Sequence, residues 1–304
     1  MQLYTKLMPI NAKNGTAVAL GYFDGVHLGH RAVIGAAVQY ARRNGCDSAV
    51  FTFSMPSNTE IKGKGILSEE LKQERIAALC VEHYMSPSFS EFCKLTPLEF
   101  VSEILVEKFA ARAVFCGDNF TFGAHKAGDV ALLTKLCKEY GIQVYAEHLA
   151  QYNDIIVSST RIRTLLIRGD VDKANAMLGA PYAINYEVVH GKGLGAKLGV
   201  PTINQVFAQH MLMPKCGVYA TRVYINGKIY SAATGLGSRP TVQGEGITCE
   251  SFIKGFDGDI YGEKIKVEFI KYLHDTKRYE TLNELRDMIN EAAEKSEALF
   301  IKTK

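Results

Sequence analysis

Over about the first 150 residues, short apolar runs alternate with segments of helical periodicity, and few folds accommodate this order. Strand-like runs at 17–23 and 48–53 flank a helix-like segment that ends at Asn44-Gly45. Parallel strands need long crossover connections, which are usually helices. The pattern predicts an α/β domain with a doubly wound parallel sheet, covered on both faces and binding ligands at the carboxyl ends of its strands. Further helices are expected at 68–79, 97–109 and 128–140, and further strands at 112–116 and 141–145.

The pattern changes from about residue 185 onward. Two strand-like runs, 218–225 and 228–233, are separated by Asn226-Gly227, the strongest short signal for a β-hairpin. Another strand is expected at 259–270 and a closing helix at 281–300. We interpret this half as a small antiparallel β-barrel with a closing helix, joined to the first half by the helical stretch 160–178. The predicted domains are 1–180 and 181–304.

Composition excludes several classes of protein. A chain of 304 residues that is 47% hydrophobic and 22% charged is long enough for about two globular domains. A formal charge of +3 without Lys/Arg runs argues against a nucleic-acid partner. The seven scattered cysteines contain no C-x-x-C pair, and no apolar run reaches the length of a membrane span. We expect a cytoplasmic monomer or weak homo-oligomer with small-molecule partners and no membrane contact.

The segment GYFDGVHLGH, residues 21–30, joins the first predicted strand to the first predicted helix. His27 and His30 fall just before or within the first helical turn, where free backbone N–H groups and the helix dipole favour an anion. The glycines at 21, 25 and 29 let the backbone approach a phosphate closely. The alternatives are two solvated histidines at a helix start, or a zinc site, which would need two more ligands.

A second segment, IVSSTRIR at 156–163, places three hydroxyl side chains before an amphipathic helix and two arginines in its first turn. Positive charges at a helix N-terminus interact unfavourably with the helix dipole. An anion bound between the two arginines would offset this and explain their position. The simpler alternative is a Ser/Thr helix cap with exposed arginines.

Together these two segments resemble the paired signature of the HxGH nucleotidyltransferase superfamily, and the first is most similar to its FAD synthetase branch. The resemblance implies that His27 and His30 are catalytic and hold the ATP phosphates. It assigns ATP binding to Gly21, Phe23, Asp24, Gly25, His27, Gly29, His30, Ser158, Ser159, Thr160 and Arg163. An incoming FMN phosphate is already anionic, so this reaction needs no general base.

The segment GKGLGAKLGVPTIN, residues 191–204, contains G-x-G-x-x-A but does not fit a dinucleotide-binding fold. Such a fingerprint must open a helix, whereas Pro201 follows within a few residues and the next segments have strand character. The segment instead offers a glycine-rich flap followed by Thr202 and Asn204, whose side-chain oxygens suit Mg²⁺.

With PKCGVYA at 214–220, GSRPT at 237–241 and CES at 249–251, this half resembles riboflavin kinase, and the whole chain resembles a bifunctional riboflavin kinase/FAD synthetase. The resemblance implies that Glu250 is the general base for the riboflavin 5′-hydroxyl and that Thr202 and Asn204 bind Mg²⁺. It assigns ATP binding here to Gly191, Gly195, Gly199, Pro201 and Thr202. Flavin binding is assigned to Asn119, Phe120, Phe122, Arg239 and Glu250, although the two phenylalanines could instead fill the core.

Some positions depart from the family pattern. Ser54 and Met55 replace a proline-histidine stretch, Asn119 stands at an aspartate position, and Gly235 and His274 replace an asparagine and an arginine. The leading hypothesis is ATP-dependent phosphorylation of riboflavin to FMN, followed by adenylylation of FMN to FAD with release of pyrophosphate. The alternatives are an FAD synthetase whose barrel binds flavin without efficient kinase activity, a flavin-binding regulator without turnover, and a transferase with another phosphorylated acceptor.

Overall fold

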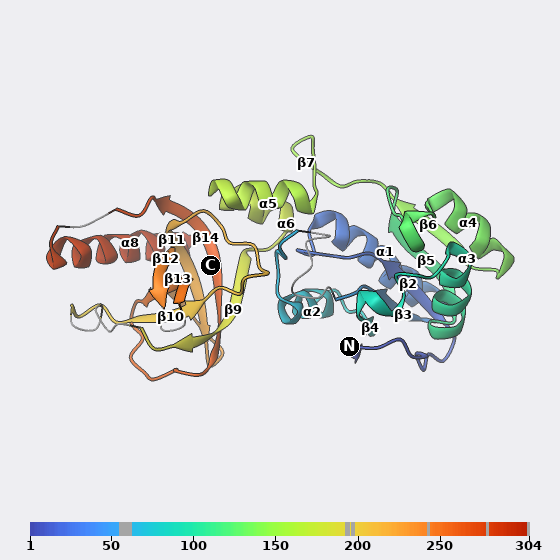
Figure 1. Cartoon of the computed structure of the whole chain (residues 1–304), viewed down its shortest axis with the longest axis horizontal. Coiled ribbons are helices and arrows are strands. Elements are labelled where there is room, and N and C mark those ends of the chain that lie inside the picture. Colours follow the sequence, from blue (N-terminus) through green and yellow to red (C-terminus); the bar gives the residue numbers. More distant parts are fainter. Residues whose placement is uncertain (55–62, 192–194, 196–197, 242–243, 278–279, 303–304) are drawn as a thin grey trace. The chain divides into compact units, whose positions relative to one another are not determined.

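The computed structural model describes residues 1–54, 63–191, 195, 198–241, 244–277 and 280–302, without the side chains of 238–246 and 302 (Figure 1). The chain forms two compact units. The first contains residues 1–63 and 72–159, and the second contains residues 64–71 and 160–304. Because 64–71 belongs to the second unit, the chain leaves the first unit and returns to it before the barrel begins.

The first unit is built around a six-stranded sheet in the order β1-β4-β3-β2-β5-β6, and every strand pair in it is parallel. Its strands are β1 (Gln2–Tyr4), β2 (Thr16–Leu20), β3 (Asp47–Phe51), β4 (His83–Met85), β5 (Ala111–Gly117) and β6 (Gln143–Glu147). The direction in which the chain adds strands reverses between β2 and β5. Open α/β sheets bind ligands at the carboxyl ends of their strands at such a reversal.

Helices cover the sheet, as the alternating sequence predicts. They are α1 (Leu28–Asn44), α2 (Glu69–Ala77), α3 (Pro97–Glu99), the π-helix η2 (Phe100–Lys108) and α4 (Val130–Glu139). The predicted helix at 97–109 begins with a capping box, because Thr96 accepts from the backbone of Glu99 while the Glu99 carboxylate accepts from Thr96 N. A short hairpin, β7 (Gln151–Tyr152) and β8 (Ile155–Ile156), precedes the end of the unit.

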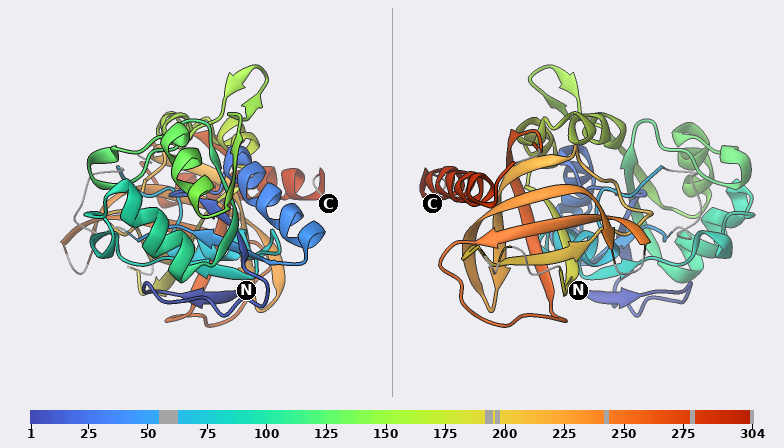
Figure 2. Two further views of the ribbon diagram at one scale, coloured as in Figure 1. Left: turned by 90° about the vertical axis from the view of Figure 1, so that its right-hand side faces the viewer. Right: turned by 60° about the vertical axis from the view of Figure 1, so that its left-hand side comes forward.

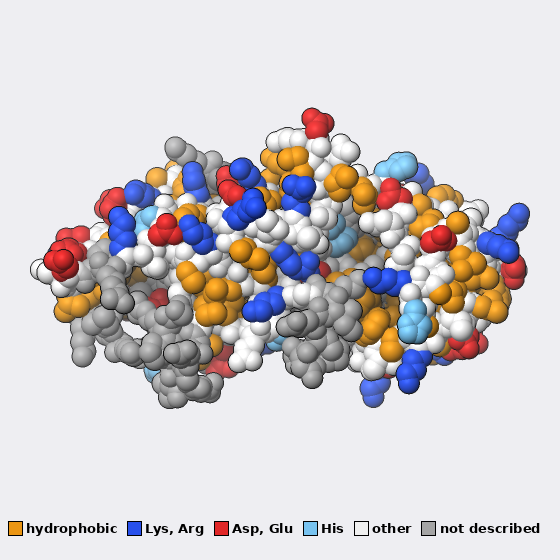
Figure 3. All heavy atoms as spheres, turned by 45° about the horizontal axis from the view of Figure 1, so that its top comes forward, with side chains coloured by type: hydrophobic (Ala, Val, Ile, Leu, Met, Phe, Trp, Pro, Cys, Tyr) orange, Lys and Arg blue, Asp and Glu red, His pale blue; other side chains and the backbone are white. Residues whose placement is uncertain are grey.

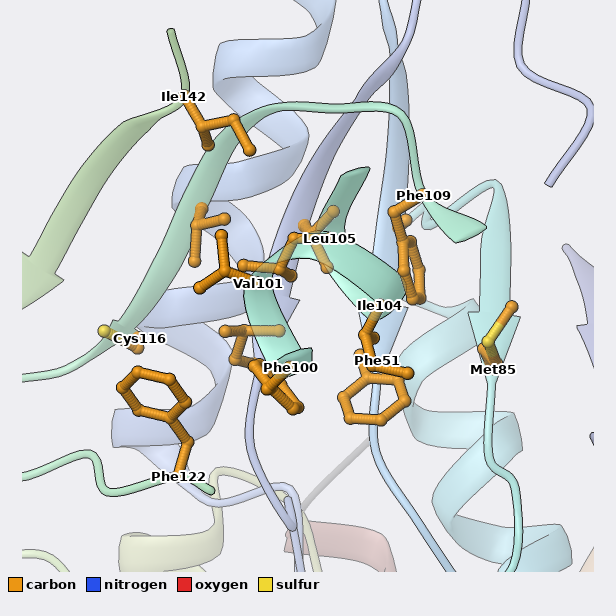
Figure 4. Close-up of a cluster of buried hydrophobic side chains, with 14 of the residues drawn as sticks. Phe51, Met85, Phe100, Val101, Ile104, Leu105, Phe109, Cys116, Phe122 and Ile142 are labelled. Atoms are coloured by element: carbon orange, nitrogen blue, oxygen red, sulfur yellow. The ribbon is translucent and has the colours of Figure 1, made fainter. Parts of the chain in front are cut away.

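The core of the first unit lies between the sheet and η2 (Figure 4). Phe51 from β3 packs edge-on against Phe100 and Phe109, with ring centroids 5.8 Å apart in both pairs. Alternate strand residues face the opposite side, where α1 packs and Tyr40 meets Phe115 at 5.6 Å. This two-sided burial explains the nearly continuous apolar runs in these strands.

The second unit contains a closed antiparallel barrel in the order β10-β13-β12-β11-β14-β9, together with helices (Figure 2). The predicted helical stretch 160–178 is two helices, α5 (Ser159–Arg168) and α6 (Val171–Leu178), which separate at Gly169. The barrel strands are β9 (Tyr182–Val189), β10 (Thr202–Val206), β11 (Gly217–Ile225), β12 (Lys228–Thr241), β13 (Gly244–Ile253) and β14 (Lys264–His274). Helix α8 (Leu282–Lys302) packs against β11 and β12.

Two sequence predictions for the barrel have different outcomes. The Asn226-Gly227 turn is confirmed, because both residues have left-handed φ angles, 48° and 74°, between β11 and β12. The predicted strand start at residue 259 was wrong, since β14 begins at Lys264. Residues 259–263 form turns, where Asp259 accepts a hydrogen bond from Tyr261 N and Gly262 has a φ of 79°.

Replacing Phe109 with alanine should destabilise the protein by about 3–5 kcal/mol, because its ring is fully buried and leaves a cavity beside Phe51. Chemical denaturation followed by circular dichroism measures the loss. Leu98→Ala is the matched control, since Leu98 is half exposed and should change the free energy of unfolding by less than about 0.5 kcal/mol. Equal effects of the two substitutions would contradict this account of the core.

Candidate active sites

The loop between β2 and α1 has an unusual backbone conformation. Phe23, Gly25 and Val26 have φ angles of 54°, 87° and 47°, in the left-handed region. Only glycine enters this region readily, so the surrounding structure must hold the phenylalanine and the valine there. Both side chains are buried, at 2% and 0% exposure. Gly21 is needed for a separate reason, since a Cβ atom there would lie 2.7 Å from the Phe23 ring.

Side chains from distant parts of the sequence hold the carbonyl groups of this loop. Thr52, just past the end of β3, donates its hydroxyl to the carbonyl of Tyr22 at 2.9 Å. Ser159, at the start of α5, donates its hydroxyl to the carbonyl of Asp24 at 3.0 Å. The structure therefore brings together the two segments that the sequence marked as phosphate-binding, through Ser159.

His27 and His30 lie at the N-terminus of α1, where the sequence placed them. His27 is the N-cap, and its Nδ1 accepts a hydrogen bond from His30 N at 3.3 Å. In a neutral imidazole an accepting Nδ1 leaves the proton on Nε2, so His27 can donate from Nε2. The two rings stack with centroids 3.5 Å apart. The Nδ1 of His30 is buried and has no hydrogen-bond partner among the described atoms.

Burial keeps this histidine pair neutral. It lowers the pKa of His27 from 6.5 to about 4. Burial also lowers the pKa of His30 well below its usual value, and the nearby positive charges of His27 and Lys72 lower it further. Near neutral pH both rings are therefore hydrogen-bond donors without net charge.

Helix α2 contributes two basic residues that the sequence analysis missed. Arg75 donates to the carbonyl of Gly25 at 3.3 Å. Lys72 is only 5% exposed, and its Nζ donates to Thr52 Oγ1 at 3.5 Å. Their spacing of three places both on one face of the helix. From the sequence alone such a face is expected to be exposed to solvent, so nothing indicated that these residues contact the loop.

The remaining predicted residues of this site lie near the same segments. Gly29 is in the first turn of α1, and Ser158 immediately precedes α5. Thr160 and Arg163 are counted in the second unit, where Arg163 Nε donates to the carbonyl of Lys64 at 2.9 Å. Their role toward ATP stays a prediction.

The flavin segment, which contains the predicted flavin-binding residues Asn119, Phe120 and Phe122, follows β5, the neighbour of β2 in the sheet. Its position at the reversal of strand order places it beside the histidine loop. Asn119 is exposed and Phe120 is half-buried. Phe122 is 5% exposed and belongs to the core cluster, where its ring lies 5.3 Å from that of Phe100. Phe122 therefore fills the core, which is the alternative that the sequence left open, whereas Asn119 and Phe120 are at least partly accessible.

The barrel brings three predicted kinase positions onto one face of its wall. Asn204, on β10, pairs with Glu250 on β13, which pairs with Gly235 on β12. Directly paired residues on antiparallel strands point to the same face of a sheet, and so do residues two apart on one strand. Thr202, two residues before Asn204, therefore faces the same way as Glu250.

Thr202 and Glu250 line a cavity of about 100 Å³ between this wall and α8. The barrel contributes Val218, Ala233 and Phe252 to its lining. Helix α8 supplies a mainly apolar opposite wall, formed by Leu285, Met288, Ile289 and Ala292. The cavity thus combines one carboxylate and one hydroxyl with apolar surfaces, as binding sites for flat, largely apolar ligands do.

The glycine-rich flap packs on the two predicted magnesium ligands. A Cβ atom at Gly191 would lie 2.4 Å from Asn204 Nδ2, and one at Gly195 would lie 3.4 Å from Thr202 Oγ1. Gly191 is therefore required by the close approach of the Asn204 side chain, whereas Gly195 is required because a Cβ atom there would lie 2.5 Å from the carbonyl oxygen of Val200. Gly199 has a φ of 72° and Pro201 is exposed. Residues 192–194 and 196–197 of the flap lie outside the described residues.

Thr202 also lines a second cavity of about 120 Å³. Its lining includes Phe256, Asp257 and Tyr261, and the Tyr261 ring stacks on His190 at 3.8 Å. The sequence analysis did not identify these residues, and Tyr261 lies in a turn where a strand was expected. Arg239, the remaining predicted flavin residue, belongs to β12, but its side chain lies outside the described part of the structure.

Among the described residues, no group of three or more His, Cys, Asp or Glu side chains is placed to hold a metal ion, so His27 and His30 lack the further ligands that a zinc site needs there. None of the described helices is both long enough and apolar enough to span a membrane. On the face drawn in Figure 3, basic and acidic side chains are interspersed.

Comparison with known protein families matches both halves of the chain. The model of the FAD synthetase family matches residues 10–161, and the model of the riboflavin kinase family matches residues 178–300. A crystal structure described as a macrolide-efflux protein from Streptococcus pneumoniae has 27% sequence identity and a TM-score of 0.86, covering 98% of this chain and 99% of its own.

Curated relatives match over nearly their whole length. Bifunctional riboflavin kinase/FMN adenylyltransferases from Bacillus subtilis and Pseudomonas fluorescens are 33% and 32% identical to this chain, covering 93% and 95% of it. The matches cover 92% and 95% of those relatives. The enzyme of the same description from Escherichia coli strain K12 is 32% identical over 91% of this chain and 90% of its own. The chain belongs to the bifunctional riboflavin kinase/FMN adenylyltransferase family.

Proposed function

We propose that the second unit phosphorylates riboflavin to FMN with ATP and that the first unit adenylylates FMN to FAD. The observation that carries the proposal is that each unit contains, close together, the side chains expected for one of the two reactions. Thr202 and Glu250 line one cavity beneath α8, and the stacked histidines occupy a helix N-terminus at the carboxyl end of β2. Neither set depends on a residue of the other.

In the kinase reaction, Glu250 takes the proton of the riboflavin 5′-hydroxyl as that oxygen attacks the γ-phosphorus of ATP. The new O–P bond forms while the bond to the ADP oxygen breaks. The apolar wall of α8 suits the isoalloxazine ring, and the cavity beside Phe256 and Tyr261 suits the adenosine. Because Thr202 lines both cavities, the phosphate chain would pass this residue.

In the adenylyl transfer, a phosphate oxygen of FMN attacks the α-phosphorus of ATP and pyrophosphate leaves. The acceptor is already ionised, so no side chain has to remove a proton. The N–H groups of the neutral imidazoles and of the first turn of α1 can donate hydrogen bonds to the phosphoryl oxygens. Of the three predicted residues of the flavin segment, Asn119 and Phe120 are at least partly accessible.

Magnesium fits the barrel site. Thr202 and Asn204 offer oxygen donors on the same face of β10, and the glycines of the flap leave room beside them. Two neutral protein oxygens bind Mg²⁺ weakly by themselves, so phosphate oxygens of ATP would complete the coordination. Bound there, the ion neutralises charge on the transferred phosphoryl group.

A cytoplasmic location is consistent with the cysteines. All seven are unpaired, and Cys116, Cys137 and Cys249 are buried, where burial raises the pKa of each thiol. Thiols in this state persist in a reducing compartment.

The direct test uses the purified chain with ATP and Mg²⁺, started either from riboflavin or from FMN, with the flavins separated by chromatography. FAD from both starting compounds is the expected result. FAD from FMN alone would support the alternative of an adenylyltransferase with an inactive barrel. FAD from neither would refute the proposal.

His30→Ala should reduce FAD formation from FMN by about 100-fold or more, because it removes a donor that the growing phosphoryl charge needs. FMN formation from riboflavin should be retained, since Glu250 and Thr202 are untouched. Both rates come from the same chromatographic assay. His148→Ala is the control, as that histidine is exposed and lies outside the loop. Parallel loss of both activities would argue against two separate sites.

Glu250→Gln should reduce FMN formation from riboflavin by about 100-fold or more, because glutamine has nearly the same shape but accepts no proton. Conversion of supplied FMN to FAD should continue at the wild-type rate. Glu187→Gln provides a matched control, since this exposed residue lies on β9 of the same barrel. A fully active Glu250→Gln enzyme would exclude Glu250 as the base.

The buried histidine pair should make stability depend on pH. The folded-state pKa of His27 is about 4 and its ordinary value is 6.5, so between these limits the unfolded chain binds more protons. Stability should therefore be full above about pH 6.5 and fall as the pH approaches 4. His27→Asn keeps an N-cap side chain but does not titrate, and its melting temperature should fall less between pH 7 and pH 5. Identical falls would contradict the neutral state of His27.

A further inference from the structure

The neutral histidines leave a requirement for positive charge in the adenylyl site. Pyrophosphate gains negative charge as it leaves, and stabilising that charge carries most of the catalysis in phosphoryl and adenylyl transfer. The rings of His27 and His30 stack at 3.5 Å and His27 is 6% exposed, so two like charges there would repel strongly. They supply hydrogen bonds, so an ammonium or guanidinium group has to supply charge from the protein.

Lys72 is the buried cation of this site. It is 5% exposed, and its Nζ contacts Thr52, which itself holds the carbonyl of Tyr22 at the start of the histidine loop. The same Nζ lies 5.5 Å from the centre of the Tyr22 ring. A lysine is almost never fully buried unless it is paired, so polar or charged partners must hold the ammonium group in place.

The position of Lys72 relative to the sheet supports this role. Thr52 directly follows β3, and Tyr22 lies just beyond β2, so the ammonium group sits where two parallel strands end. That edge is where α/β proteins bind phosphorylated ligands. Lys72 is also close enough to His30 to act on it electrostatically.

We propose that the ammonium group of Lys72 is a catalytic contact of the adenylyl transfer, binding the phosphates of ATP and stabilising the departing pyrophosphate. This inference rests on the proposed function and adds a residue to it. As the bond between the α-phosphorus and the bridging oxygen breaks, the electron pair goes to pyrophosphate. Lys72 offsets that charge at low dielectric without giving up its proton.

The test compares Lys72→Met and Lys72→Arg with the wild-type full-length chain, measuring FAD formation from FMN. Methionine keeps most of the volume but removes the charge, and kcat should fall about 100-fold. Arginine keeps the positive charge but carries it on a larger, planar guanidinium group. Its kcat should stay within about tenfold of the wild-type value. Lys135→Met is the matched control, because Lys135 is exposed on α4 of the same unit. It should have wild-type kcat.

A second measurement separates charge from packing. The histidine Cε1 protons are followed by NMR between pH 4 and 8, with His30 identified by its absence in His30→Ala. Removing the nearby positive charge should raise the pKa of His30 in Lys72→Met but not in Lys72→Arg. The melting temperature of each variant, followed by circular dichroism, reports whether the first unit is folded.

Three outcomes are decisive. If the wild type makes no FAD from FMN, the proposed function itself fails. If the wild type makes FAD and Lys72→Met matches its kcat, only the role of Lys72 is overturned. If methionine and arginine reduce kcat equally and leave the pKa of His30 unchanged, Lys72 is a packing residue and the inference is also overturned.

Discussion

The adenylyl site depends on keeping a phenylalanine and a valine in a backbone conformation that L-residues avoid. Each left-handed residue costs about 1–2 kcal/mol, and Phe23 and Val26 adopt it within four positions. Burial of both side chains offsets this strain, and hydrogen bonds from Thr52, Ser159 and Arg75 hold the loop carbonyls. These bonds come from three separate segments, so the loop takes its shape only after the sheet has formed. The histidines directly follow this loop, so the bonds that fix its backbone also fix their position.

The two sites solve different chemical problems, and the difference lies in the acceptor. In the proposed kinase reaction a ribityl hydroxyl must lose a proton, and the proposed base, Glu250, lies in a cavity that Thr202 also lines. A phosphate is already charged, and the first unit supplies neutral donors with a buried cation nearby. Burial is therefore used in opposite ways. It keeps imidazoles uncharged in one unit, while in the other it provides an apolar wall around one carboxylate.

Much of this arrangement could be predicted from the sequence, and the exceptions have physical reasons. The parallel sheet, the Asn226-Gly227 turn and the Thr96 capping box depend on local patterns, and all are present. So is the N-terminal position of His27 and His30. Lys72 could not be found, because burial of a helical lysine depends on what packs over it. Met288 and Tyr261 were missed for the same reason, since α8 and a turn meet the barrel only in three dimensions.

The short segment 64–71 gives the chain a discontinuous second unit. Its Gly65 exchanges backbone hydrogen bonds with His210 and Leu212, while Ser68 donates to Asn185 and Glu70 pairs with Lys264. A fragment that starts at Thr160 would thus lack eight residues that cover polar and backbone groups of its own barrel. A cut at the apparent boundary before Thr160 would therefore separate hydrogen-bonding and ion-pairing groups that lie together within one compact unit.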